Sequence, residues 1–563
     1  MGLSTTYTKT ETDFLIQQLE KKSEVLYTDD TLATDIIKRV DINTGENVNY
    51  RETTTHYDGS VMDDTKVDGV IYIKNNGKYL MRSIDDGVIN ASWFGNDDLA
   101  IQKAINIATG NAAGTKIPYY SVYIPAGFWN INNKILIEKT QWLNIYGDGA
   151  STKININADL DCVFDFNSFA HSTFGHLIVT SLSNKIVEDV IRIRWDDGNN
   201  VTNGRSTTHN VFTDIQIFGE LKYKNGINIM GHNDVSQCHF ENILITGNKN
   251  YNVITDRWEN AFKVGDTIAA NNLSHIFTNC KGFNVENIFD FSGAGGIVIG
   301  TGGQNAKRYI KRSAPSHESL MILGGRLEGI ERIYEATTKN SFSDNVTLKG
   351  IWYSGLGGSG FGAPEDGKII IGSGMINIEG CKFVDPHQNA PFVIEAENAF
   401  AGNEMIAITT INISGLFVER ANMDGLIQSW NGTKCVFNIS GLVLIDEQQN
   451  PVQYITNFTK TFFCHQEPQL QKINTEYGNW IEVSNKIGNK GLSFWQDDVS
   501  HITANSSGAL YLEGFQYVVG TRFLGDYEFN EYEDNSAPDN IIYYSNTQSK
   551  AVYKRNGVVN PLY

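Results

Sequence analysis

Between residues 174 and 445, short runs alternate between apolar and polar positions, as β-strands do when one face is buried. The runs share a template: an apolar residue, any residue, then Gly, Asn, Asp or His, a small or aliphatic residue, any residue and a mostly apolar one. Nine copies begin at residues 174, 212, 240, 277, 322, 348, 378, 413 and 439, in steps of 26–45 residues. Repetition at this period predicts a solenoid whose coils stack on one another.

Several short strands per repeat, bounded by Gly and Asn, predict an all-β protein built on a parallel β-helix. The alternative is a β-sandwich, which has turns about every 8–12 residues and no common template. The repeat therefore favours the β-helix.

The two ends of the chain have a different character. Residues 8–40 contain two short amphipathic helical patterns, too short to be stable alone, which we expect to pack on a partner chain or on the body of the protein. Residues 41–66 are polar and have the composition of a linker or small adaptor. We therefore predict an N-terminal attachment segment at 1–66, the β-helix at 67–455, and a β-rich C-terminal domain for trimerisation or carbohydrate binding at 456–563. The last of these should contain hairpins turning at Asn546-Thr547 and Asn556-Gly557.

The composition excludes several classes of protein. The chain has 563 residues, 41% of them hydrophobic and 11% aromatic, which excludes a disordered protein. A formal net charge of −19 argues against nucleic acid or an anionic membrane surface as the main partner. No apolar run is long enough for a membrane span, and no secretory signal is visible at the N-terminus. We therefore expect no membrane insertion.

The six cysteines are widely scattered and lack the spacing of a disulfide framework or zinc site. We expect them to be free, buried thiols, and we expect no metal and no cofactor. The positions are Cys162, Cys238, Cys280, Cys381, Cys435 and Cys464.

A distinct opening segment precedes the repeats. In "WFGNDDLAIQKAI", Asp97 and Asp98 lie where a helix start favours acidic residues, and a helix over about 97–109 should end at Gly110. The short β-rich runs "VYIPAGFWNI" and "LNIYGDG" follow it. These stretches resemble the start of the pectate-lyase-like β-helix superfamily as it occurs in bacteriophage tailspikes, in which a helix caps the solenoid. The resemblance covers roughly residues 90–450 and implies that the β-helix is right-handed and single-stranded.

This resemblance implies a homotrimer that binds a bacterial capsular or O-antigen polysaccharide and often depolymerises it. It also implies a virion protein, assembled in the host cytoplasm, which acts at the bacterial surface and is attached to the phage tail or baseplate through its N-terminus. Classical pectate lyases bind calcium through clustered aspartates, but no such cluster is evident here, so calcium is not expected.

The fifth and seventh positions of each copy should point outward and stack in columns about 4.8 Å apart. Charged and aromatic residues gather in the middle copies, where we expect an exposed groove. The predicted substrate-binding residues are Arg326, Trp352, Tyr353, Lys281, Lys382 and Glu419.

Glycoside hydrolysis needs two carboxyl groups beside the scissile bond. Aligning "VENIFDF" with "IERIYEA" stacks Glu286 on Glu331 and Asp290 on Glu335, and stacked carboxylates repel, which favours a proton on one of them. The predicted catalytic pairs are therefore Glu328 with Glu331, or Asp290 with Glu335. Arg326 would hold one partner ionised or bind an acidic sugar.

Hydrolysis by a carboxylate pair is the leading prediction, with two alternatives. The first is a polysaccharide lyase, in which Lys281 or Tyr353 acts as base and Arg326 neutralises a uronate carboxylate. The second is a receptor-binding fibre that adheres through the same groove without cleaving the polymer.

Overall fold

The computed structural model divides into two compact units, residues 1–333 with 357–362 and residues 334–356 with 363–563, and each is described by itself. It describes residues 36–110, 118–181, 185–195, 207–218, 222–230, 235–248, 258–265, 272–314, 318–336, 345–355, 368–385, 392–396, 399–401, 404–407, 409–420, 425–429, 434–445, 460–463, 472–473, 481–482, 495–496, 500–504, 510–513, 531–537, 539 and 541–561. The helical patterns before residue 36 and the glycine-rich stretch 356–367 lie outside these ranges. At Ile37–Val40, the end of the second helical pattern, the structure has a β-strand, so the predicted helix is wrong there. In the described parts, no helix is both long and apolar enough to cross a membrane.

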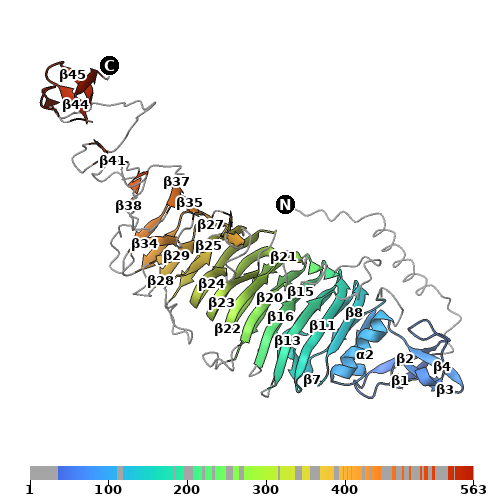
Figure 1. Ribbon diagram of the computed structural model, residues 1–563. Coiled ribbons are helices and arrows are strands. Elements are labelled where there is room, and N and C mark those ends of the chain that lie inside the picture. Colours follow the sequence, from blue (N-terminus) through green and yellow to red (C-terminus); the bar gives the residue numbers. More distant parts are fainter. Residues whose placement is uncertain are drawn as a thin grey trace. The chain divides into compact units, whose positions relative to one another are not determined.

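The first unit opens with a small antiparallel sheet of four strands in the order β1-β2-β4-β3 (Figure 1). The strands are β1 (Ile37–Val40), β2 (Asn47–Glu52), β3 (Tyr72–Asn75) and β4 (Lys78–Arg82). Thus β3 and β4 lie in this small sheet, although the sequence placed the start of the solenoid at residue 67. The first strand with a parallel partner is β5 (Val88–Asn90), which pairs with β6 (Ser121–Ile124).

A buried ion pair links the small sheet to the residues that follow β5. Arg82 donates to Asp41, and its guanidinium lies 3.5 Å from the ring centroid of Trp93. Asp41 Oδ1 also accepts hydrogen bonds from the backbone N–H groups of Asn43 and Thr44, at 2.8 and 2.9 Å. Burial raises the pKa of Asp41, but the hydrogen bonds from Arg82 and the backbone outweigh burial and lower it overall.

This pair should give stability that depends on pH. Because the folded-state pKa of Asp41 is depressed, its contribution is present above the unfolded value near 4 and is lost as pH falls through the folded value. We expect Asp41→Asn, which leaves Arg82 without its buried anion, to lower the melting temperature at pH 7 and by progressively less as the pH falls below about 4. A difference in melting temperature that stays constant over this pH range would contradict the assignment.

The predicted capping helix is confirmed as α2 (Asp98–Thr109). Asp97 is its N-cap and accepts from the N–H of Ala100 at 2.9 Å, while Gly110 follows its last residue with φ 68°. The apolar face of α2 is buried and contacts β5, β6, β7 (Gly127–Ile131) and β8 (Ile135–Gln141). It therefore covers the first coil, as a capping helix should.

After this helix the first unit is a parallel β-helix, as predicted, with three ladders of in-register strands (Figure 1). The first ladder is β6, β9 (Asn144–Gly147), β12 (Thr173–Thr180), β15 (Val211–Ile217), β18 (His239–Glu241), β21 (Asn272–Thr278) and β23 (Ala294–Ala314). The second is β7, β10 (Thr152–Ile156), the later halves of β12 and β15, β19 (Leu244–Thr246), β22 (Lys281–Ser292) and β23.

The third ladder carries the residues on which the function is argued below. It consists of β8, β11 (Leu160–Ala170), β13 (Ile186–Arg194), β16 (Lys222–Ile229), β20 (Trp258–Val264) and the later halves of β22 and β23. Its inward residues stack as a continuous apolar column, in which Phe262 and Phe289 have ring centroids 4.8 Å apart. Stacked apolar side chains of this kind form the core, because no coil can bury its inner face alone.

The second unit contains further parallel coils. Its strands include β25 (Asn345–Ser354), β26 (Ile370–Gly372), β27 (Met375–Glu379), β28 (Lys382–Asp385), β29 (Phe392–Ala396), β32 (Thr409–Ser414), β33 (Phe417–Arg420), β34 (Gly425–Ser429), β35 (Lys434–Ser440), β36 (Val443–Ile445) and β37 (Lys460–Phe463). Near the C-terminus, β44 (Ile541–Ser545), β45 (Lys550–Arg555) and β46 (Val558–Pro561) pair antiparallel, which confirms the two predicted hairpins.

Four of the cysteines, Cys162, Cys238, Cys280 and Cys381, are buried free thiols, as expected.

The third position of the repeat template has a structural reason. In every copy this residue has positive φ, in the left-handed region that Gly, Asn, Asp and His adopt most readily. The residues are His176, Asp214, Asn242, Asn279, Gly324, Gly350, Gly380, Gly415 and Gly441, with φ between 51° and 69°. The template therefore records a turn that recurs once per coil.

Gly380 offers a clean test of this turn, because a Cβ added there would meet nothing within 4 Å and only backbone strain would be felt. We expect Gly380→Val to cost about 1–2 kcal/mol of stability and Gly380→Asn clearly less, since Asn visits this conformation. The urea midpoints of the two variants measure the difference. Equal losses would show that the turn conformation is not the constraint.

One coil escaped the sequence repeat. A tenth left-handed residue, Gly300 with φ 58°, lies in β23, where Val298 stacks on Phe277. The 45-residue step from 277 to 322 therefore spans two coils, of 21 and 24 residues. The missed copy, "VIGTGG", has glycines at its fifth and sixth positions, and the sixth position is a larger apolar residue in most other copies. Because this coil follows β22, its residues, and not those of the copy at 322, lie beside the charged residues of β22.

Candidate active site: a charged face of the first unit

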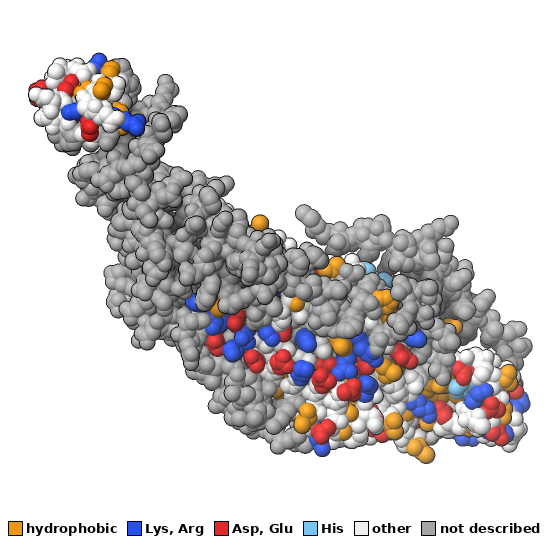
Figure 2. Space-filling model, in the orientation of Figure 1, with side chains coloured by type: hydrophobic (Ala, Val, Ile, Leu, Met, Phe, Trp, Pro, Cys, Tyr) orange, Lys and Arg blue, Asp and Glu red, His pale blue; other side chains and the backbone are white. Residues whose placement is uncertain are grey.

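Two rows of polar side chains run across the third ladder, and a band of mixed basic and acidic groups crosses the first unit in Figure 2. The strand registers define the outer row as Asp161, Glu188, Lys224, Glu259, Glu286 and Lys307. The second row, four residues further along each strand, is Asp165, Arg192, Asn228, Lys263, Asp290 and Lys311. Members of a row lie about 4.8 Å apart, the spacing of adjacent strands.

Asp161 and Glu188 are stacked on adjacent strands in the outer row. Their neighbours on both sides are paired, Leu160 with Val187 and Cys162 with Asp189, so Asp161 lies opposite Glu188. Their side chains are 53% and 51% exposed, which leaves both carboxylates accessible to a large ligand. Two accessible carboxylates at strand spacing have the arrangement that acid–base chemistry on a sugar polymer requires.

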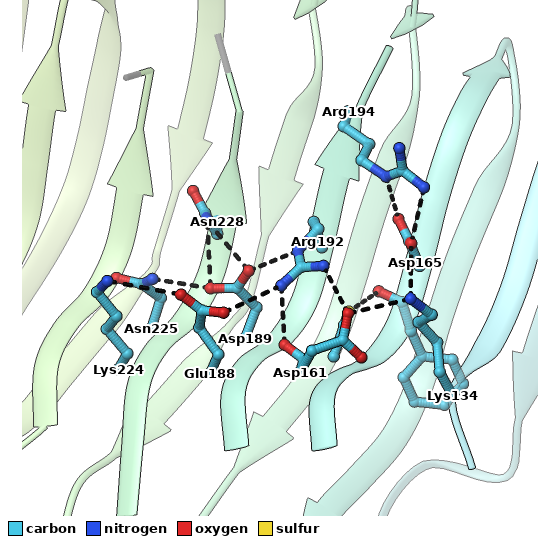
Figure 3. Close-up of polar contacts among 12 residues, drawn as sticks. Lys134, Asp161, Asp165, Glu188, Asp189, Arg192, Arg194, Lys224, Asn225 and Asn228 are labelled. Carbon is cyan, nitrogen blue, oxygen red and sulfur yellow. Dashed lines mark hydrogen bonds and ion pairs between the residues drawn. The ribbon is translucent and has the colours of Figure 1, made fainter. Parts of the chain in front are cut away.

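The two carboxylates have different surroundings. Asp161 accepts from Lys134 Nζ at 3.0 Å and from Arg192 Nη1 at 3.1 Å (Figure 3). Burial raises the pKa of Asp161, but these two hydrogen bonds outweigh burial and lower it overall. Glu188 has only longer contacts, 3.7 Å to Arg192 Nη2 and 3.5 Å to Lys224 Nζ. Pairs of carboxyl groups held in unlike environments are typical of sites where one group is a base and the other an acid.

Arg192 connects this pair to a buried carboxylate. Its Nε donates to Asp189 at 2.6 Å, and its Nη2 donates to the carbonyl of Asp161 at 2.8 Å. The side chain of Asp189 is 1% exposed and also accepts from Asn225 at 2.8 Å and from Asn228 (Figure 3). A guanidinium held by a buried anion has a fixed orientation, so Arg192 presents its other two nitrogens to the outer row.

Beneath the outer row lies an asparagine ladder, formed by Asn225, Asn260 and Asn287 between Asp189 and Arg308. Each amide nitrogen donates to the oxygen of the preceding coil: Asn287 to Asn260 at 2.9 Å and Asn260 to Asn225 at 2.8 Å. Arg308 donates to Asn287 at 3.1 Å at one end, and Asp189 accepts at the other. Because arginine can only donate and a carboxylate only accept, the end groups fix the direction of every amide.

The stacking predicted for Glu286 and Asp290 is not formed. Asp290 is paired in register with Lys263 on one side and Lys311 on the other, and accepts from Lys311 Nζ at 3.1 Å and from Ser313. Glu286 lies between Glu259 and Lys307, not against Glu331. The reason is the coil of β23, which follows β22 and was absent from the alignment. Both neighbours of Asp290 are therefore lysines, where a second carboxylate was predicted.

The stretch around residue 326 is a strand, β24 (Leu320–Ala336), as predicted. Arg326 and Glu328 share its outer face: Arg326 Nε donates to Glu328 at 2.7 Å, and the arginine side chain is 74% exposed. Glu331 is buried and lies 3.7 Å from Arg332. Lys281 is exposed and paired with Leu244 and Gly302, so it is not adjacent to Arg326 as the repeat implied.

The remaining predicted residues lie in the second unit. Trp352, Lys382 and Glu419 are on outward positions, and Lys382 Nζ lies 5.0 Å from the ring centroid of Phe417. Tyr353 is fully buried against Phe383, so it points inward, contrary to the prediction, because adjacent residues of a strand face opposite sides. Glu335 pairs in register with Ile371.

Sequence reasoning did not select Asp161, Glu188 or Arg192. A second repeat would have found them: "DCVFDF" at 161, "EDVIRI" at 188, "KNGINI" at 224, "ENAFKV" at 259, "ENIFDF" at 286 and "KRYIKR" at 307 share one register. Each copy begins with an acidic or basic residue. The fourth residue is apolar in all six copies, and the sixth is apolar in all except "KRYIKR". Across the described ranges, no three His, Cys, Asp or Glu side chains are grouped so as to hold a metal ion.

The sequence matches no protein-family model and no curated protein. Among solved structures, the chain is similar to ORF18 of Geobacillus virus E2, with 14% identity, a TM-score of 0.37, and 89% of this chain and 94% of that chain covered. It is similar to the catalytic domain of a GH87 alpha-1,3-glucanase in complex with nigerose, with 15% identity, a TM-score of 0.37, and 66% and 74% covered.

A third similar structure is full-length tailspike protein 2 from an Escherichia coli O157:H7 bacteriophage. The identity is 13% and the TM-score 0.43, and the match covers 75% of this chain and 51% of the tailspike, about half of its length. These values assign neither a family nor an activity to the chain.

Proposed function

We propose that the protein is a tailspike that binds a bacterial capsular or O-antigen polysaccharide and depolymerises it by hydrolysis of glycosidic bonds. The observation that carries the proposal is the exposed Asp161–Glu188 pair, stacked on adjacent strands and held in unlike environments by Arg192 and Lys134. The surrounding rows of polar groups extend along the coils, which suits a linear polymer better than a small molecule.

In the proposed mechanism, Asp161 is the ionised carboxylate and Glu188 the proton donor. Glu188 gives its proton to the glycosidic oxygen as the bond to the anomeric carbon breaks, and Asp161 attacks that carbon to form a glycosyl ester. Glu188 then takes a proton from water, whose oxygen displaces Asp161 and restores both groups. Strand spacing of about 4.8 Å between the two residues matches the close carboxyl pair of retaining glycosidases.

The charges of this face favour hydrolysis over β-elimination. Most cations of the two rows and the asparagine ladder contact carboxylates: Arg192 contacts Asp161 and Asp189, Arg308 contacts Glu286, and Lys311 contacts Asp290. A uronate would have to compete with these carboxylates for the same cations. The arrangement therefore supports a neutral polysaccharide as substrate, whereas elimination requires a uronate.

The test is to incubate the protein with purified capsular polysaccharides and O-antigens from a panel of bacterial strains, following polymer size by gel filtration and the ultraviolet absorbance of the products. A fall in size without new absorbance is expected. New absorbance would show the conjugated double bond that a lyase leaves. Stable binding with no fall in size would point to a receptor-binding fibre.

Assembly as a homotrimer, attachment to the phage tail or baseplate through the N-terminus and location in the virion also form part of this proposal. They rest on the resemblance of the opening segment. Sedimentation of the purified chain tests the trimer directly.

A further inference from the structure

We propose that Asn228 forms a saccharide subsite next to the Asp161–Glu188 pair and accepts a hydrogen bond from a hydroxyl or acetamido N–H of a neutral sugar. This inference rests on the proposed function. Asn228 lies on β16, one coil beyond Glu188, in the second row between Arg192 and Lys263. A polymer chain that reaches Glu188 and continues along the coils meets Lys224 in the outer row, and Asn228 lies four residues further along that strand.

The amide of Asn228 is held in one orientation. Its Nδ2 donates to both carboxylate oxygens of Asp189, at 3.2 and 3.1 Å. Turning the amide over would place its oxygen against a carboxylate that can only accept, so Asp189 selects the orientation observed. The oxygen Oδ1 therefore points away from Asp189 (Figure 3).

This oxygen has no hydrogen-bond partner in the structure, although Asn228 is only 6% exposed. Buried polar atoms are almost always paired, so an acceptor held in place without a donor needs a partner from outside the chain, either water or a ligand. That partner must be a donor. Sugar hydroxyl and acetamido groups are neutral donors, which also fits a face on which most cations contact carboxylates.

The residue beside Asn228 permits access from the surface. Lys263 follows Asn228 in the second row and is partly exposed, with a flexible side chain. In the proposed subsite, the sugar approaches Oδ1 from the side of Lys263, whose side chain must move aside. A sugar without a donor at this point would leave Oδ1 unpaired on binding. The site should therefore bind such a sugar much more weakly than one with the matching donor.

The experiment measures binding and cleavage separately, on the polymer that the wild-type protein shortens in the gel-filtration assay. Dissociation constants are measured by calorimetry in a Glu188→Gln background, which keeps the polymer intact. Asn228→Ala is compared with Asn225→Ala, since both remove a donor to Asp189 but only the first removes the unpaired acceptor. Thermal melting of both variants reports the structural cost.

We expect Asn228→Ala to weaken binding at least tenfold more than Asn225→Ala, even though Asn225→Ala also breaks the hydrogen bond from Asn260 and should lower the melting temperature more. Equal weakening by the two variants would assign Asn228 a structural role and overturn the subsite, while cleavage by the wild type would leave the proposed function standing. If the wild-type protein neither binds nor shortens any polymer of the panel, the proposed function fails, and the subsite fails with it.

Discussion

Glu188→Gln is expected to lower the rate of depolymerisation by about 10²–10⁴-fold, the contribution typical of a positioned general acid. The side chain of Glu188 is half exposed, and its contacts to Arg192 and Lys224 are 3.5 Å or longer. Replacing the carboxylate by an amide therefore removes little stabilising interaction. The melting temperature should therefore stay close to that of the wild type. The loss should appear in kcat, measured as the initial rate of new reducing ends.

Matched variants make this result specific. Glu379→Gln changes a partly exposed glutamate in the second unit, which pairs with Lys349 at 2.9 Å, and should leave the rate unchanged. Glu286→Gln tests the stacked Glu259–Glu286 pair further along the same row. If Glu188→Gln keeps full activity and Glu286→Gln loses it, the catalytic pair is Glu259 with Glu286. If only Glu328→Gln loses activity, the catalytic pair is Glu328 with Glu331, as predicted from the sequence.

The repeat template predicted the fold because its signal is local. A left-handed turn once per coil restricts one position to Gly, Asn, Asp or His, and alternation marks the strands on either side. Both are visible in a single copy such as "FENILI", where Asn242 has φ 55°. The helix that caps the first coil was equally visible, since its N-cap Asp97 and its terminating Gly110 are local features.

The candidate site was not predictable in the same way, because it depends on which coils are neighbours. The alignment placed "ENIFDF" at 286 against "ERIYEA" at 331, but "KRYIKR" at 307 lies next to the first of them. One missed coil replaced the predicted carboxylate stack with Asp290 beside Lys311. The sequence of one strand shows which of its side chains face outward. To know which side chains are neighbours on adjacent coils, every coil between them must be recognised.

Loss of Arg192 should have the largest effect on stability. Arg192→Met leaves the buried carboxylate of Asp189 with only the amides of Asn225 and Asn228, and removing one partner of a buried ion pair costs about 3–5 kcal/mol. Arg192→Lys should recover part of this, since one ammonium cannot replace three guanidinium nitrogens directed at Asp189, Asp161 and Glu188. Both variants should also lose activity, because Asp161 loses a hydrogen bond.

The matched control is Arg326→Met, because the side chain of Arg326 is 74% exposed and its pair with Glu328 should be worth about 1 kcal/mol or less. Hydrogen exchange of peptides from β11 and β13 is the suitable measurement, since a chain of two compact units need not unfold in one step. Exchange in these peptides should accelerate strongly in Arg192→Met and not in Arg326→Met. Equal protection in the two variants would mean that Asp189 is held by the asparagine ladder alone, and that the guanidinium orients the outer row without supporting the coils beneath it.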